Sequence, residues 1–120
     1  MKKILTAALL GLSLNSFADD APLWLRFSAI SPDGQTIAFS YKGDIFSVPV
    51  NGGTAKQLTT NSAYDAYPVW SPDGQKIAFA STREGSMDVY LMDKNGGVPK
   101  RLTTNSGSET PMAFTDNSHV

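Results

Sequence analysis

The sequence predicts an all-β fold: a partial β-propeller with two consecutive four-stranded antiparallel blades and the start of a third. Three observations lead to this prediction. The segment ISPDGQTIAFS at residues 30–40 returns almost unchanged as WSPDGQKIAFA at residues 70–80. Between the turn residues, large and small apolar residues alternate with the period of two that is typical of strands. A repeat of about 44 residues that holds four short strands has the length of a propeller blade.

The first 18 residues have the features of a secretory signal. A positive start, MKK, precedes an apolar run over residues 4–14, and SFA at residues 16–18 supplies the small residues that a signal peptidase recognises. The apolar run is shorter than the roughly 20 residues of a membrane helix, and no cysteine follows it that could carry a lipid. We therefore expect cleavage after Ala18, no membrane span, and export of residues 19–120, an incomplete β-propeller, to the periplasm or the extracellular space.

The composition argues against several classes of function. There are 10 Lys and Arg residues against 11 Asp and Glu residues, the formal net charge is −1, and the charges are scattered along the chain. This balance provides no basic surface for nucleic acid or anionic lipid. With no cysteine and one histidine, a disulfide framework and a zinc-type site are excluded. We expect no nucleic acid, no metal and no other cofactor.

The repeat divides the chain into blade 1 at about residues 22–61, blade 2 at about 62–105 and the start of blade 3 at about 106–120. In blade 2 we expect strands at residues 67–70, 77–80, 88–92 and 98–103. Ser-Pro-Asp-Gly forms the turn before the second strand, because proline presets φ and glycine closes the turn. Asn-Gly-Gly is a strong hairpin signal before the fourth strand. Blade 2 has four extra residues, 81–87 against 41–43, and we expect a hairpin tip to absorb them.

Two sets of residues in the second strands are expected to pack the blades together. The large residues that should fill the space between blades are Ile37, Phe39, Ile77 and Phe79. The small residues that should let the next sheet approach closely are Ala38 and Ala78. Apolar residues also hold one equivalent position before each turn: Ile30, Trp70 and Phe114.

A third copy begins at Phe114, lacks the proline of the turn, and runs to Val120. Propellers close with about four to eight blades. We therefore expect this chain to be a fragment, or a truncated product, of a longer protein whose further blades complete the ring. A small protein that completes the ring by self-association is the alternative.

The repeated Ser-Pro-Asp-Gly-x-x-Ile-Ala-Phe, followed by Asp-(Ile/Val)-(Phe/Tyr), Asn-Gly-Gly and Leu-Thr, resembles the propeller repeat of tricorn proteases, the Tol-system propeller protein and prolyl-oligopeptidase relatives. The start Pro22-Leu23-Trp24-Leu25-Arg26 is similar to the opening of secreted tricorn-like serine peptidases. The resemblance covers residues 22–120. It implies a non-catalytic propeller segment that gates or guides peptide to a downstream peptidase domain, with a peptide or protein substrate as partner. A protein-binding propeller of an envelope complex, with an envelope protein as partner and no enzymatic activity, is the alternative, and a prolyl-oligopeptidase relative is a third.

The resemblance places the catalytic residues in the downstream part, so no catalytic, cofactor-binding or metal-binding residue is assigned here. His119 is expected at a solvent-facing position, and no Gly-x-Ser-x-Gly elbow singles out a nucleophilic serine. The sequence from Asp93 to Gly96 is only faintly similar to a calcium loop, and Thr104 stands where that loop needs a glutamate.

The remaining polar and aromatic candidates have structural interpretations. Carboxylates that recur at equivalent positions are expected to have a structural role, such as capping turn amides; they are Asp33, Asp44, Asp73, Asp88 and Asp116. Arg83 and Glu84 are expected in a solvated loop tip, where a partner contact is the less favoured alternative. Tyr64 and Tyr67 lie between the blades, where packing is favoured over lining a channel.

Overall fold

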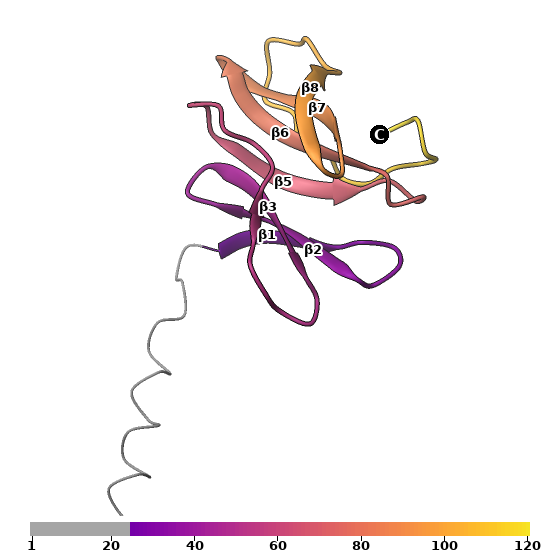
Figure 1. Cartoon of the computed structure of the whole chain (residues 1–120). Helices are drawn as coiled ribbons and strands as arrows, with labels where there is room; N and C mark the ends of the chain where they lie inside the picture. The colour runs from indigo at the N-terminus through magenta and orange to yellow at the C-terminus, as the bar shows by residue number, and fades with distance from the viewer. Residues whose placement is uncertain (1–24) are drawn as a thin grey trace, which may run out of the picture.

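The computed structural model describes residues 25–120 as two four-stranded antiparallel sheets packed face to face (Figure 1). Blade 1 contains β1 (Leu25–Ile30), β2 (Thr36–Tyr41), β3 (Asp44–Pro49) and β4 (Lys56–Gln57). Blade 2 contains β5 (Asp65–Trp70), β6 (Lys76–Glu84), β7 (Ser86–Asp93) and β8 (Gly96–Arg101). Each sheet has its strands in chain order, so the predicted all-β fold with two consecutive blades is confirmed. The expected signal at residues 1–18 lies outside the described residues.

The turn between the first two strands is built alike in both blades. Ser31 N donates to the carbonyl of Thr36 at 2.8 Å, and Ser71 N donates to the carbonyl of Lys76 at 2.9 Å. The closing glycine, Gly74, has a φ of 69°, a conformation that glycine adopts without strain. The repeated phrase is therefore a structural unit, as its turn chemistry predicts.

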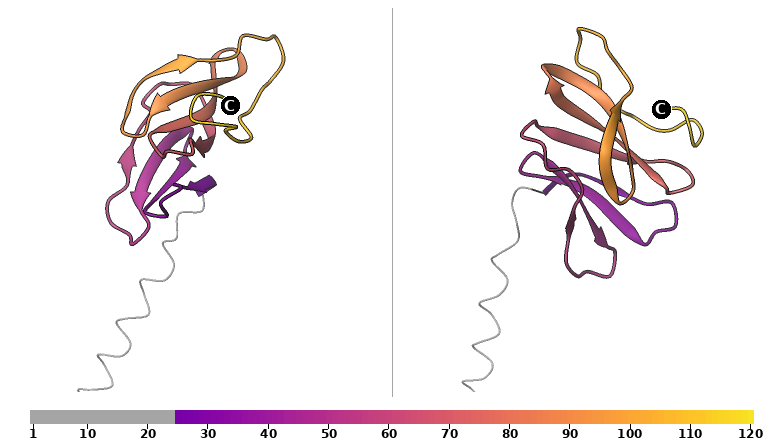
Figure 2. Two further views of the ribbon diagram at one scale, coloured as in Figure 1. Left: turned by 90° about the vertical axis from the view of Figure 1, so that its right-hand side faces the viewer. Right: turned by 45° about the horizontal axis from the view of Figure 1, so that its top comes forward.

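The core between the blades is asymmetric. Ile77 and Phe79 of β6 lie in one cluster with Ala38 of β2, and all three are fully buried. The register places Ile77 opposite Met92 and Phe79 opposite Tyr90, so the large side chains of blade 2 share one face. That face packs on Ala38, Ile45 and Leu58 of blade 1, in the stack of two sheets that both views of Figure 2 show.

The expectation that all four large residues lie between the blades is half right. Ile37 and Phe39 alternate with Ala38 along β2, so they point to the opposite face of blade 1. No described sheet covers that face, where they line a shallow apolar hollow with Leu25 and Val48. The sequence period fixes which residues share a face, but not which neighbour covers it.

The extra residues of blade 2 do not form the expected loop tip. They lengthen both strands, so that β6 has 9 residues and β7 has 8, against 6 in β2 and 6 in β3. The hairpin closes around Gly85, and the pairing is irregular between Ser81 and Glu84. Thr82 N also donates to the carbonyl of Tyr64 at 3.2 Å, so the lengthened strand gains partners in the segment between the blades.

The segment after β8 forms no strand within residues 102–120, but it repeats two contacts of blade 2. Glu109 N donates to the carbonyl of Met87 at 2.7 Å, as Asp65 N does to that of Gly43 at 2.8 Å. Thr115 N donates to the carbonyl of His119 at 2.9 Å, which closes a turn one residue shorter than the earlier two. The third copy therefore begins as the repeat predicts, as far as its turn.

Candidate functional site

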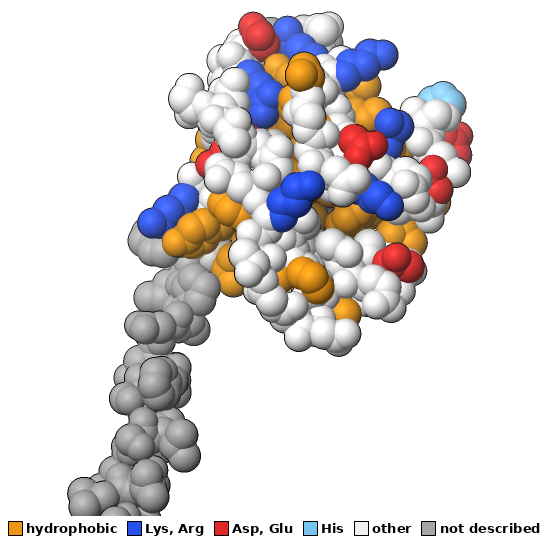
Figure 3. Space-filling model, in the orientation of Figure 1, with side chains coloured by type: hydrophobic (Ala, Val, Ile, Leu, Met, Phe, Trp, Pro, Cys, Tyr) orange, Lys and Arg blue, Asp and Glu red, His pale blue; other side chains and the backbone are white. Residues whose placement is uncertain are grey.

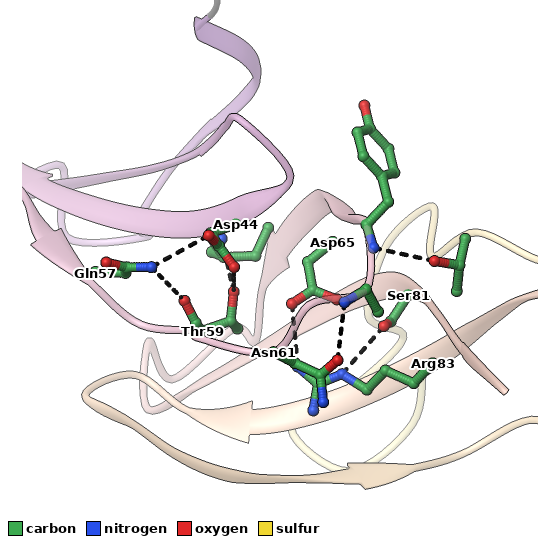
Figure 4. Close-up of polar contacts among 11 residues, drawn as sticks. Asp44, Gln57, Thr59, Asn61, Asp65, Ser81 and Arg83 are labelled. Atoms are coloured by element: carbon green, nitrogen blue, oxygen red, sulfur yellow. Dashed lines mark hydrogen bonds and ion pairs between the residues drawn. The ribbon is translucent and has the colours of Figure 1, made fainter.

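A polar seam runs along the junction of the two blades, at the end where β5 begins (Figure 4). It consists of Asp44, Gln57 and Thr59 from blade 1 and of Asp65, Ser81 and Arg83 from blade 2. The seam holds a fully buried charge, that of Asp65, which folded proteins retain only when it is paired.

Asp65 and Arg83 form the central ion pair of the seam. Arg83 Nη2 lies 3.0 Å from Asp65 Oδ2, and the two side chains are 15% and 0% exposed. Arg83 Nε donates to Ser81 Oγ at 3.1 Å. Its guanidinium carbon also lies 5.3 Å from the ring centroid of Tyr90, close enough for a cation–π contact. Arg83 is therefore a strand residue that ties blade 2 together, and the predicted solvated loop tip is wrong for it, although Glu84 is exposed.

The blade 1 half of the seam surrounds Asp44. Gln57 Nε2 donates to Asp44 Oδ2 at 3.2 Å, and Thr59 Oγ1 donates to Asp44 Oδ1 at 3.4 Å. Thr59 Oγ1 in turn accepts the amide of Ile45 at 2.9 Å. Burial and, secondarily, the negative charge of Asp65 raise the pKa of Asp44 above its ordinary value.

The equivalent carboxylate of blade 2, Asp88, is paired more strongly. Arg101 Nη2 lies 2.7 Å from Asp88 Oδ2, and Asp88 is fully buried. Asp44 and Asp88 therefore bind the end of the fourth strand through side chains, so the structural role expected for them is a contact between strands and not a turn cap. The reason is their place in the sheet: Asp44 begins β3 and Asp88 is the third residue of β7, so each lies beside the fourth strand of its blade.

The other three recurring carboxylates do cap turns, as expected. Asp33 Oδ1 accepts the Ser31 hydroxyl at 2.6 Å and the amide of Gln35 at 3.0 Å. Asp73 repeats both contacts with Ser71 and Gln75. These hydrogen bonds, the serine hydroxyl first, lower the pKa of Asp33 and of Asp73. Asp116 accepts the amides of Ser118 and His119 in the third turn, and its pKa is also lowered.

His119 is exposed and does not form a catalytic triad with its neighbours. Ser118 Oγ lies 3.1 Å from His119 Nδ1, and Asp116 Oδ2 lies 2.8 Å from the same nitrogen. A triad needs the serine on one ring nitrogen and the carboxylate on the other. The side chains of His119 and Asp116 are 74% and 56% exposed, so the contact belongs to a solvated turn.

The aromatic residues between the blades have separate roles. The Trp70 indole donates from Nε1 to the carbonyl of Ala29 at 3.0 Å, which fastens β5 to β1. The rings of Tyr67 and Phe27 pack with their centroids 4.0 Å apart. Both residues have positive φ, 56° and 50°, which is unusual for bulky side chains. Tyr64 is 42% exposed and lines a hollow between the blades.

No metal site and no surface of a single charge stands out in the part of the chain that the structure describes. Positive and negative side chains are interspersed over the face shown in Figure 3. Within residues 25–120, no group of three His, Cys, Asp or Glu residues is placed to hold a metal ion. Asp93 Oδ1 accepts the amide of Asn95 at 3.0 Å, as in an ordinary turn. No helix in this range is long and apolar enough to cross a bilayer.

Comparisons with known proteins point to propellers. Residues 22–120 match the sequence profile of the tricorn protease N-terminal beta propeller domain. Tricorn protease homolog 1 of Streptomyces coelicolor is 39% identical over 71 residues, which cover 59% of this chain and 6% of that protein. A TolB homolog of Chlorobium luteolum is 32% identical over 90 residues, 68% of this chain and 21% of that protein. The crystal structure of TolB from Acinetobacter baumannii superposes with a TM-score of 0.65 at 28% identity, over 78% of this chain and 24% of that one. The chain thus spans between 6% and 21% of the curated relatives it matches.

Proposed function

This chain belongs to the family of tricorn protease N-terminal β-propeller domains, and from that membership we propose that it is the propeller segment of an exported, tricorn-like serine peptidase. In this role the blades receive peptide substrate and guide it to a peptidase domain that is not part of residues 25–120. The observation that carries the proposal is the family match over residues 22–120, together with the similarity to a tricorn protease homolog.

The geometry of the described residues supports a non-catalytic role for these blades. The buried carboxylates Asp65 and Asp88 are each paired with an arginine, which suits them to holding strands together. Asp116 and His119 share a solvated turn, without a second base or an enclosed site. Under this proposal the reaction uses groups from outside the described range.

A protein-binding propeller of the TolB type, without enzymatic activity, is the second candidate. The TolB homolog aligns over a larger share of this chain than the tricorn homolog does, 68% against 59%. Under this proposal the blades contact a protein of the cell envelope, and no peptide bond is cleaved by any part of the protein.

Fluorophosphonate labelling of the protein as the cell makes it separates the two candidates. A serine peptidase is expected to bind the probe covalently at a serine outside residues 19–120, and to cleave fluorescein-labelled casein. A binding propeller is expected to give neither signal and to crosslink to envelope proteins instead. Labelling of a serine within residues 19–120 would contradict both proposals.

We further propose that residues 1–18 direct export and are removed after Ala18. N-terminal sequencing of the protein recovered from the periplasm or the medium is expected to begin at Asp19. A sequence that begins at Met1 would contradict this.

A further inference from the structure

A hollow lies between the two blades, beside the seam but separate from it. It has a volume of about 410 Å³ and is lined by Arg26, Ser40, Lys42, Gly43 and Tyr64. Arg26 and Ser40 face each other across β1 and β2, Lys42 and Gly43 form the tip of the β2–β3 hairpin, and Tyr64 precedes β5. Since both walls belong to described blades, the hollow does not result from an uncovered sheet face.

The hollow carries positive charge that no described acid neutralises. Among the described residues, neither Arg26 nor Lys42 takes part in an ion pair, whereas Arg83 and Arg101 are both paired with carboxylates. Lys42 Nζ lies 5.3 Å from the ring centroid of Tyr41, which orients the ammonium group without cancelling its charge. Two unpaired cations beside one cavity favour an anionic ligand.

A buried hydroxyl in the same wall is also without a partner. Ser40 is 3% exposed, and its Oγ makes no hydrogen bond among the described residues. A buried polar atom that is left unpaired costs stability and calls for an explanation. A ligand that accepts a hydrogen bond from Ser40 Oγ would explain why this hydroxyl has no partner in the protein.

Comparison of the blades shows that stacking does not require these polar residues. The register position of the Arg26–Ser40 pair is occupied in blade 2 by Ala66 and Ala80. Both alanines are fully buried, so two small apolar residues can occupy this pair of positions in a stacked blade. The polar pair of blade 1 is therefore free to have a function of its own.

The opposite wall is apolar and close. A Cβ built on Gly43 would lie 3.4 Å from Tyr64 Cδ2, and Gly43 has a φ of 83°. Glycine thus lets the tyrosine ring lie directly against the hairpin tip. A ligand in this hollow meets cations and a hydroxyl on one side and an aromatic ring on the other.

We propose that this hollow binds a carboxylate of a polypeptide. Arg26 and Lys42 hold the carboxylate through charge-assisted hydrogen bonds, Ser40 Oγ donates a further one, and Tyr64 packs against the adjoining part of the peptide. The carboxylate comes from an Asp or Glu side chain or from the C-terminus of the peptide. This inference rests on the proposed function, because it names the chemistry by which the blades recognise the polypeptide they receive.

Binding of random ten-residue peptides to the protein as the cell makes it tests the inference. One library ends in free acids and a second in amides, so that enrichment of Asp and Glu is distinguished from selection of a free C-terminus. The best peptide is then synthesised with its carboxylate intact and with that group replaced by the amide, and fluorescence anisotropy measures both affinities. We expect the carboxylate form to bind more tightly.

Variants connect the selectivity to the hollow. Arg26→Gln with Lys42→Gln is expected to weaken the carboxylate peptide by about a hundredfold, about tenfold for each of two charge-assisted hydrogen bonds, and to leave the amide peptide unchanged. Lys76→Gln with Lys100→Gln removes the same charge at exposed positions of blade 2 that do not line the hollow, and should change neither affinity. Ser40→Ala copies the alanine of blade 2, so it should fold, and it should weaken only the carboxylate peptide, by about threefold.

The outcomes separate this inference from the proposed function. Peptides that bind without preference for a carboxylate, or that lose as much affinity in the Lys76/Lys100 variant, overturn the carboxylate site and leave a peptide-receiving propeller intact. If no peptide from either library binds, both the inference and the proposed function fail.

Discussion

Blade 1 and blade 2 place their large apolar side chains at the same register positions, yet only blade 2 has that face covered by another sheet. Ile77 pairs with Met92 in blade 2 as Ile37 pairs with Val48 in blade 1. Ile77 is fully buried, whereas the equivalent Ile37 is only partly buried and its cross-strand neighbour Ile30 is 62% exposed. The difference shows that this face of a blade is shaped to be covered by the face of a neighbour that carries Ala38 in blade 1.

The hydrogen bonds and ion pairs between strands are also stronger in blade 2 than in blade 1. Asp88 of blade 2 is held by the arginine Arg101, while the equivalent Asp44 of blade 1 is held by the neutral Gln57. Asp65, at the start of β5, is fully buried and ion-paired, whereas β1 begins in the exposed Leu25. Blade 2 therefore combines more buried area with stronger electrostatic ties, and we expect it to contribute most of the stability.

The largest expected effect tests this asymmetry at two equivalent phenylalanines. Phe79→Ala should lower the free energy of unfolding by about 4 kcal/mol, because it empties a fully buried site between two sheets. Phe39→Ala should cost less, about 2 kcal/mol, because Phe39, although only 9% exposed, lines the hollow on the outer face of blade 1, where its ring centroid lies 5.8 Å from that of Phe46. Urea unfolding followed by circular dichroism measures both. Equal losses would show that the outer face of blade 1 is as well covered as the inner one.

A smaller effect is expected from the arginines that pair with buried carboxylates. Arg83→Ala leaves the fully buried Asp65 without its counter-ion and should cost about 3 kcal/mol. Arg101→Ala should cost about 1–2 kcal/mol, because Arg101 is 33% exposed and water can enter the space it leaves. Urea unfolding at pH 7 checks the ranking.

A compensating change serves as the control for Arg83. When both partners are replaced, in Arg83→Met with Asp65→Asn, no charge stays buried, so most of the lost stability should return. A double variant as unstable as Arg83→Ala would mean that the packing of the Arg83 side chain on Tyr90, and not the ion pair, provides its contribution.

Much of this architecture could be predicted from the sequence because the local signals agree with one another. The strands expected at residues 67–70, 77–80, 88–92 and 98–103 are found at 65–70, 76–84, 86–93 and 96–101. The turns follow from serine, aspartate and glycine at fixed places, and their contacts recur in each copy. These features depend only on residues a few positions apart.

Features that depend on distant residues could not be predicted. The pairing of Arg83 with Asp65 requires the strand extension of β6, which a length change alone does not distinguish from a loop. Nothing in the sequence marks Phe27 and Tyr67 for positive φ, because the bulge arises from the register of two strands. The polar pair Arg26 and Ser40 also could not be singled out from the sequence, because it stands out only by comparison with the alanines at the equivalent positions of blade 2.

The smallest expected effect concerns pH and again sets the two blades against each other. The pKa of Asp44 is raised above 3.8 by burial, so its ionisation opposes folding, and the penalty appears as the pH rises through 3.8 to the folded pKa. The pKa of Asp73 is lowered below 3.8 by the Ser71 hydroxyl and the Gln75 amide. Its contribution is therefore fully present above 3.8 and is lost as the pH falls through its folded pKa.

Substitution by asparagine should consequently have opposite signs at the two positions. Asp44→Asn is expected to stabilise the protein slightly at pH 7, with the gain vanishing at pH 3, where Asp44 is protonated in both states. Asp73→Asn is expected to destabilise it at pH 7, with the loss shrinking as the pH falls below 3.8. Urea midpoints between pH 2.5 and 7 provide the measurement. If both variants shift the midpoint in the same direction across this range, burial does not dominate at Asp44, and its contacts with Gln57 and Thr59 must favour the charged form as strongly as the turn does at Asp73.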